Sequence, residues 1–179
     1  MFCNGRCRFA NRIMKVAVTG ATGFVGKHVL AELELRSVES IAVLRSAKDK
    51  TLDHFSCGVV QFDLHKPPFN AYELMGCPDI VIHLAWSGLP NYNSLHHFNQ
   101  ELPAQYQFLK NLIESGLQNL LVAGTCAEYG MQAGMLSEDI AGHPSNSYGF
   151  AKDALRRKLE HLKTVHPFQL TWARLFYLY

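Results

Sequence analysis

The chain has 179 residues, 48% of them hydrophobic and 18% charged, which suffices for one globular domain with its own core. Lys and Arg number 17 against 15 Asp and Glu, so no strong field favours nucleic acid or anionic lipid as a partner. No apolar run approaches the ~20 residues of a membrane span, and residues 1–13 lack the apolar core of a secretory signal. We therefore expect a cytoplasmic protein that binds neither nucleic acid nor membrane, with residues 1–13 as a disordered extension before a domain over 14–179.

Short apolar runs alternate with longer runs of helical periodicity along the whole chain. The predicted strands are 15–19, 40–45, 58–64, 79–86, 119–125 and a sixth that begins at 168, and the predicted helices are 26–37, 99–116 and 145–166. Gly116 is the predicted C-cap of the second helix, and Ser145 or Asn146 the N-cap of the third. Because the strands are apolar on both sides, we predict an α/β fold, a doubly wound parallel sheet covered on both faces.

Three glycines, Gly20, Gly23 and Gly26, stand where the first strand meets the first helix. In a dinucleotide-binding turn, the first glycine allows a tight reversal, the second a close approach of the backbone to a pyrophosphate, and the third close helix packing. The amino end of the helix then offers N–H groups to the phosphates. The pattern predicts a dinucleotide site at this turn.

The end of the second strand reads "AVLRSAKDK" and carries Arg45 and Ser46, followed by Lys48. Proteins that bind NAD usually place an acid here, which grips the ribose 2′-hydroxyl. An arginine and a hydroxyl suit a 2′-phosphate instead. We therefore favour NADP(H), while NAD(H) stays open if Arg45 is only a solvated loop residue.

The spacing Gly-x-x-Gly-x-x-Gly resembles that of the extended short-chain dehydrogenases/reductases, the NAD(P)-dependent nucleotide-sugar epimerase, dehydratase and reductase family with its Rossmann-like domain. The resemblance continues in "HLAW" (83–86), similar to the family's HxAA turn that lines the cofactor ribose. It extends to "GTCAEYG" (124–130) and to the Tyr-x-x-x-Lys of residues 148–152.

The resemblance assigns roles residue by residue. It places Asp63 at the adenine amino group and Asn99 on a helix near the active site, and it makes Thr125, Tyr148 and Lys152 catalytic. Glu128 and Tyr129 are expected to shape the sugar pocket. The expected cofactor contacts are Gly20, Thr22, Gly23, Phe24, Val25, Gly26, Arg45, Ser46, Asp63, Leu64, Leu84, Ala85, Trp86, Asn99, Tyr148 and Lys152.

Tyr148 and Lys152 lie four residues apart and so share a helix face. A tyrosine titrates near ~10, and a neighbouring ammonium group is expected to lower that pKa and to donate to the nicotinamide ribose. With the hydroxyl of Thr125 beside the phenol, the three groups suit proton transfer at a sugar hydroxyl or ketone, while the cofactor supplies the redox step.

Two residues limit the types of reaction that the chain is expected to catalyse. The family's dehydratases follow the threonine with Asp-Glu, where this chain has Cys126 and Ala127, which argues against loss of water. NADP(H) fits a net reductase, and the resemblance implies a nucleoside-diphosphate 4-keto-6-deoxy sugar, reduced at its 4-keto group in surface polysaccharide synthesis. Two alternatives remain. The first is an NAD-dependent 4-epimerase. The second is a non-catalytic dinucleotide-binding module, because the chain ends at Tyr179, before the family's C-terminal substrate-binding part.

The remaining features favour ordinary roles. The five cysteines match no zinc pattern, and His96 and His97 are expected to face solvent, so we predict reduced thiols and no metal site. Trp86 and Tyr92 are expected to lie over the nicotinamide end of the cofactor, where they either stack on a sugar or base or are partly buried in the protein. Family members often pair through two helices, for which 104–113 and the Tyr148 helix are the candidates for a homodimer face.

Overall fold

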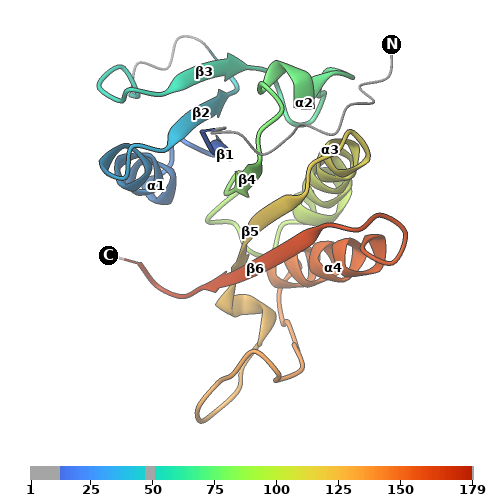
Figure 1. Ribbon diagram of the computed structural model, residues 1–179. Helices are drawn as coiled ribbons and strands as arrows, with labels where there is room; N and C mark the ends of the chain where they lie inside the picture. Colours follow the sequence, from blue (N-terminus) through green and yellow to red (C-terminus); the bar gives the residue numbers. More distant parts are fainter. Residues whose placement is uncertain (1–12, 47–50, 179) are drawn as a thin grey trace.

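The computed structural model describes residues 13–46 and 51–178, so Lys48 and nearly all of the predicted N-terminal extension lie outside the described residues. One sheet holds six parallel strands in the order β3-β2-β1-β4-β5-β6 (Figure 1). They are β1 (Lys15–Thr19), β2 (Glu39–Leu44), β3 (Gly58–Gln61), β4 (Ile80–His83), β5 (Asn119–Thr125) and β6 (Gln169–Leu175). The order reverses between β1 and β4, which confirms the doubly wound sheet and puts its switch point at the glycine turn.

Helices cover both faces of this sheet. They are α1 (Phe24–Leu35), α2 (Ala71–Leu74), the π-helix η1 (His97–Glu101), α3 (Leu102–Glu114), the 3₁₀ helix η2 (Cys126–Glu128) and α4 (Ser147–Leu162). Figure 1 shows α1 on one side of the sheet and α3 and α4 together on the other. The long connection from η2 to α4 projects away from the sheet.

The two faces have separate cores, and β1 shows why. Val16 and Val18 point into the cluster under α1 with Leu30, whereas Ala17 between them points into the larger cluster with Phe108 of α3 and Leu155 of α4. Alternate residues of a strand face opposite sides, so a strand covered on both sides is apolar throughout. These continuous apolar runs allowed the strands to be predicted from the sequence.

The observed elements differ from the predicted ones mainly at their ends. β3 stops at Gln61 and β4 at His83, earlier than predicted, so the residues that follow leave the sheet and line a crevice. α3 is capped by Ser115, and Gly116 comes one residue later with φ +115°. Asn146 is the N-cap of α4, where its side chain accepts a hydrogen bond from the amide of Gly149 at 2.8 Å. The short α2 was not predicted.

Candidate active site at the carboxyl edge of the sheet

The glycine turn fits tightly against the loop that follows β4. Gly20 has φ +69°, and a Cβ there would lie 2.8 Å from the amide nitrogen of Ala85. A Cβ on Gly26 would clash with the carbonyl of Gly20 and with the Cα of Ala21, at 2.7 Å. Gly23 is the N-cap of α1 and has no side chain that could accept a hydrogen bond from the first amides of the helix. The turn therefore fits the phosphates of a dinucleotide.

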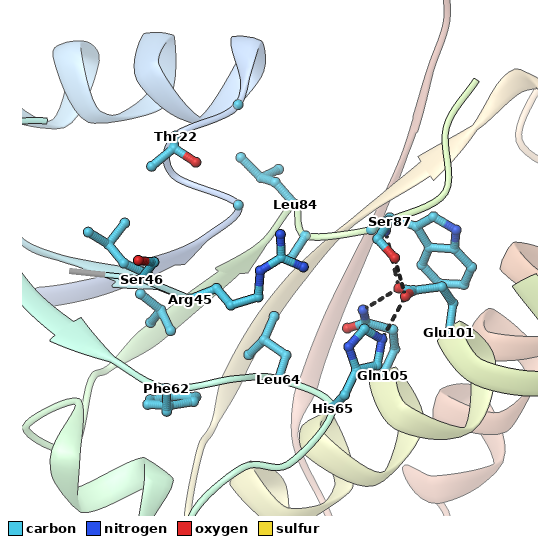
Figure 2. A pocket seen from close by; sticks show the side chains of 16 residues that line it. Thr22, Arg45, Ser46, Phe62, Leu64, His65, Leu84, Ser87, Glu101 and Gln105 are labelled. Atoms are coloured by element: carbon cyan, nitrogen blue, oxygen red, sulfur yellow. Dashed lines mark hydrogen bonds and ion pairs between the residues drawn. The ribbon is translucent and has the colours of Figure 1, made fainter. Parts of the chain in front are cut away.

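A cavity of about 390 Å³ opens beside this turn (Figure 2). We call it the cofactor cavity, and its walls are the glycine turn and the ends of β2, β3 and β4. Nine of the predicted cofactor residues line it, namely Gly20, Thr22, Gly23, Arg45, Ser46, Leu64, Leu84, Ala85 and Trp86. Figure 2 shows the side chain of Arg45 reaching into this cavity in the direction of Leu84.

The other seven predicted cofactor residues lie elsewhere, Tyr148 and Lys152 among them in a second cavity described below. Phe24 is 59% exposed and Gly26 is buried within the first turn of α1, while Val25 lines the second cavity. Asp63 does not line the cofactor cavity, and its carboxylate accepts a hydrogen bond from the amide of His65 at 3.0 Å. This bond uses only Oδ1, and the Asp63 side chain is 43% exposed, so its contact with adenine stays a prediction.

Asn99 was also expected here, and the structure corrects this. It is exposed on η1, whereas Glu101 and Gln105 of the same helical run face the cofactor cavity. Residues two apart on a helix point to different sides, so a helix that turns Glu101 inward turns Asn99 outward. Glu101 was missed, although Glu101 and Gln105 continue the apolar stripe of Phe108 and Leu112, a signal visible in the sequence.

Glu101 is the centre of a buried polar cluster in the cofactor cavity (Figure 2). Its carboxylate accepts hydrogen bonds from the hydroxyl of Ser87 at 2.5 Å, the amide of Ser87 at 3.2 Å and the side chain of Gln105 at 2.8 Å, and it lies 2.6 Å from Nε2 of His65. Burial alone raises the pKa of Glu101, but the hydrogen bonds from Ser87 and Gln105 and the charge of His65 outweigh it and lower the pKa to about 2. The carboxylate is therefore ionised at neutral pH.

A second cavity of about 530 Å³, which we call the catalytic cavity, lies between the ends of β5 and β6 and the start of α4. Thr125, Tyr148 and Lys152, the three predicted catalytic residues, all line it. Leu84 and Trp86 line both cavities and so form the wall between them. The fold thus brings the predicted catalytic residues together next to the glycine turn.

The expected coupling between Tyr148 and Lys152 is wrong for this structure. Nζ of Lys152 donates to the carbonyl of Ala123 at 2.8 Å and lies 6.0 Å from the centre of the Tyr148 ring. Burial raises the pKa of Tyr148 to about 12, helped by the charge of Glu128 and opposed by a hydrogen bond with Thr125. Burial also lowers the pKa of Lys152 to about 7. The phenol is therefore fully protonated at neutral pH.

Glu128 and Tyr129 line neither cavity, and their expected role in shaping the sugar pocket stays a prediction. Glu128 is fully buried, and its carboxylate accepts hydrogen bonds from the amide of Thr125 at 2.8 Å, from Trp172 at 3.0 Å and from Arg174 at 2.9 Å. Tyr129 accepts a bond from Arg174 at 3.0 Å. Both residues tie η2 to β6 and thereby fix the position of Thr125.

His97 is also placed differently from its prediction, because it is fully buried rather than solvent-facing. His96 is half-buried and lies 3.0 Å from the hydroxyl of Ser87. Within residues 13–46 and 51–178, no group of three or more His, Cys, Asp or Glu side chains is arranged to hold a metal ion. In the same ranges no helix has the length and apolarity needed to cross a bilayer.

The profile of the NAD dependent epimerase/dehydratase family matches residues 16–179. The dTDP-6-deoxy-L-talose 4-dehydrogenase (NAD(+)) of Aggregatibacter actinomycetemcomitans is 31% identical over 92% of this chain and 62% of its own length. The dTDP-4-dehydro-6-deoxyglucose reductase of Escherichia coli is 28% identical over 76% of this chain and 47% of its own. The chain thus spans about half to two thirds of these curated relatives.

Solved structures share the fold. A UDP-glucose-4-epimerase from Stenotrophomonas maltophila, with bound NAD and formylated UDP-arabinopyranose, aligns with TM-score 0.79 at 20% identity, over 90% of this chain and 52% of its own. MoeE5 in complex with UDP-glucuronic acid and NAD aligns with TM-score 0.71 at 26% identity, over 88% of this chain and 52% of its own. Both alignments cover nearly the whole described chain.

Proposed function

The chain belongs to the NAD dependent epimerase/dehydratase family, and we propose that it reduces the 4-keto group of a nucleoside-diphosphate 4-keto-6-deoxy sugar with a nicotinamide dinucleotide. The observation that carries this proposal is the adjacency of the two cavities, because the glycine turn lines one and Thr125, Tyr148 and Lys152 line the other, with Leu84 and Trp86 between them. The relatives named for 6-deoxy-sugar 4-dehydrogenase and reductase activities support the substrate class.

The protonation states favour reduction. A bound nicotinamide supplies the hydride. Tyr148, with a pKa of about 12, holds a proton that it donates from its phenol to the oxygen formed at the sugar C4. Thr125 lies beside it, where its hydroxyl donates a hydrogen bond to the same oxygen. Lys152 lines the same cavity, where it is placed to orient the ribose of the cofactor.

The residues beside Thr125 support a reaction without loss of water. Cys126 and Ala127 line the catalytic cavity, and neither side chain is a carboxyl group that could take or give a proton during elimination. The nearest carboxylate along the chain, that of Glu128, is buried in its bonds to β6. We therefore assign redox chemistry at C4 and no dehydration.

We assign NADP(H) as the cofactor on the charge at the end of β2. Arg45 and Ser46 are exposed and line the cofactor cavity. A guanidinium binds a 2′-phosphate bidentately, whereas the hydroxyl of NAD offers it no charge to pair with. The relative named NAD(+)-dependent makes NAD(H) the alternative.

We also propose that the chain forms a homodimer in the cytoplasm. The surface of η1 and α4 supports the dimer. Phe98 and Phe150 lie there with ring centres 6.4 Å apart, and Phe150 is 49% exposed beside a groove that Ala154 and Arg157 line. Sedimentation of the parent chain and of Phe150→Glu tests it, and a monomeric parent chain contradicts it.

The test of the function is the reaction itself. The chain, alone and joined in frame to the remaining C-terminal part of the Aggregatibacter relative, is given dTDP-6-deoxy-L-talose with NADP⁺ or NAD⁺, and a 4-keto product with reduced nicotinamide is expected. A 4-epimerase would change the sugar without net reduction of the cofactor. A non-catalytic module would bind cofactor with no product from either protein.

A further inference from the structure

Trp86 occupies the boundary between the two cavities, where the family pattern quoted above has alanine. Its ring lines the cofactor cavity on one side and the catalytic cavity on the other. It also lies edge-on to the ring of Tyr148, with ring centres 5.9 Å apart and planes at 70°. A large aromatic side chain here touches the catalytic machinery directly.

The indole is held from behind by a buried histidine. Nε1 of Trp86 donates to Nδ1 of His97 at 3.1 Å, and Nε2 of His97 lies 2.9 Å from the carbonyl of Asn91. An indole N–H can only donate and a carbonyl can only accept, so Nδ1 carries no proton and Nε2 carries one. The geometry therefore defines His97 as the neutral Nε2–H tautomer.

The front of the same ring meets Lys152. Nζ of Lys152 lies 4.2 Å from the centre of the Trp86 ring, and Lys152 is 1% exposed. A desolvated ammonium group is attracted to the face of an indole more strongly than to other rings. Its one hydrogen bond in the described residues goes to the carbonyl of Ala123, so ring and carbonyl together define where the charge lies.

We propose that Trp86 is a positioning residue, whose ring, locked by neutral His97, fixes the ammonium group of Lys152 at the junction of the cofactor and catalytic cavities. The inference rests on the proposed function for the catalytic role of Lys152. It assigns Trp86 a task beyond stacking on a ligand, because the ring acts on Lys152 from within the protein.

The charged groups around Lys152 act on its pKa in known directions. Burial lowers it, while Glu128 of η2 and Glu101 of η1 raise it. His83 at the end of β4 is buried, and its own pKa is lowered to about 3 by that burial and by the charge of Lys152, so it stays neutral. Tyr148 of α4 is protonated. The face of Trp86 adds a contribution that favours the ammonium form.

Fluorine substitution isolates this contribution, because it weakens the negative potential of the ring face while hardly changing its shape. The chain has two tryptophans, Trp86 and Trp172. The full chain is prepared with tryptophan analogues carrying one, two and three ring fluorines, and the pKa of Lys152 is followed by NMR of ¹³C-labelled lysine, assigned with Lys152→Arg. The matched control is Trp86→Phe, in which only Trp172 carries fluorine.

The expected result is a stepwise fall in the pKa of Lys152, about 0.5 or more over the series, in the parent chain and not in Trp86→Phe. A pKa that stays constant in the parent series, or falls equally in the control, overturns the inference. The readout needs no turnover, so an inactive chain contradicts only the proposed function, and an active chain with a flat series contradicts only this inference.

A second pair of variants tests the lock. His97→Gln keeps an acceptor for the indole N–H, whereas His97→Leu leaves that N–H buried without one. The fluorine dependence should persist in His97→Gln and weaken in His97→Leu. If the pKa of Lys152 depends equally on fluorination in the two variants, the role of His97 is overturned. If His97→Leu fails to fold, a pKa of Lys152 that stays constant across the series in His97→Gln also overturns it.

Discussion

Nζ of Lys152 is bonded to the carbonyl of Ala123 at 2.8 Å and stays 6.0 Å from the centre of the Tyr148 ring. The pair therefore does not act as a phenolate held by an ammonium group. Instead, burial keeps the proton on Tyr148 and weakens the hold of Lys152 on its own proton. This arrangement suits an acid that protonates a sugar oxygen during reduction.

Lys152→Met should stabilise the chain at low pH. Lysine keeps its proton up to about 10.5 in the unfolded chain but only up to about 7 in the folded one. Between these values the unfolded state binds more protons, so stability rises with pH, and below pH 7 the folded chain carries the full cost of the buried charge. The gain of the variant should be on the order of 5 kcal/mol at most below pH 7 and should vanish toward pH 10.5. Urea unfolding across this range measures it, and a gain independent of pH contradicts the buried ammonium.

Tyr148→Phe should abolish turnover and leave cofactor affinity within about twofold, since only the phenolic hydroxyl is lost. Turnover should fall by about a hundredfold or more. Tyr106→Phe is the control, because Tyr106 packs under Lys158 outside both cavities. Steady-state assays and calorimetry give the two readouts, and unchanged turnover in Tyr148→Phe would remove the acid from the mechanism.

Arg45→Ala should weaken NADPH binding by about ten- to a hundredfold and affect NADH little, because only NADPH carries the 2′-phosphate. Arg36→Ala, which removes an exposed arginine paired with Glu32, is the control for a general loss of positive charge. Equal losses for NADPH and NADH in Arg45→Ala would show that Arg45 does not read the 2′ position.

Glu101→Gln should change how stability responds to acid. The pKa of Glu101 is about 2 when folded against 4.5 when unfolded, so its contribution is complete above pH 4.5 and is lost as the pH falls through 2. At neutral pH the variant should be less stable, on the order of 3 kcal/mol at most, and the deficit should shrink in acid. Denaturant titrations at several pH values test this, and a constant deficit would speak against an ionised Glu101.

Gly26→Ala should cost about 2 kcal/mol or more of stability and should impair cofactor binding, because the new Cβ meets the backbone of Gly20 and Ala21. Gly58→Ala in β3 is the control, since its Cβ meets a side-chain carbon of Ile41 at 3.3 Å and the carbonyl of Ser40 at an ordinary contact distance of 3.6 Å. Thermal unfolding compares them. Similar melting temperatures for the two variants would refute the tight packing of the turn.

Local patterns allowed much of this molecule to be predicted. The apolar strands, the glycine turn and the four-residue spacing of Tyr148 and Lys152 are short-range signals, and each led to the correct element. The roles of Glu128 and Lys152 depend on partners far away in the chain. Glu128 binds Trp172 and Arg174, 44 and 46 residues later, and Lys152 reaches back 29 residues to Ala123. Spacing alone carries no information about such contacts.

The same limit explains His97 and Asn99. The π-helical turn of η1 sets which residues face inward, and the adjacent histidines gave no sign of it. The role of His97 can be recognised only from its hydrogen bonds to Trp86 and Asn91 in the structure.

The central claim is that the glycine turn and the cofactor cavity bind a nicotinamide dinucleotide. Isothermal titration of this chain with NADPH and with NADH tests it most directly. We expect one binding event per chain, tighter for NADPH than for NADH and lost in Gly26→Ala. A folded chain that binds neither dinucleotide would contradict it.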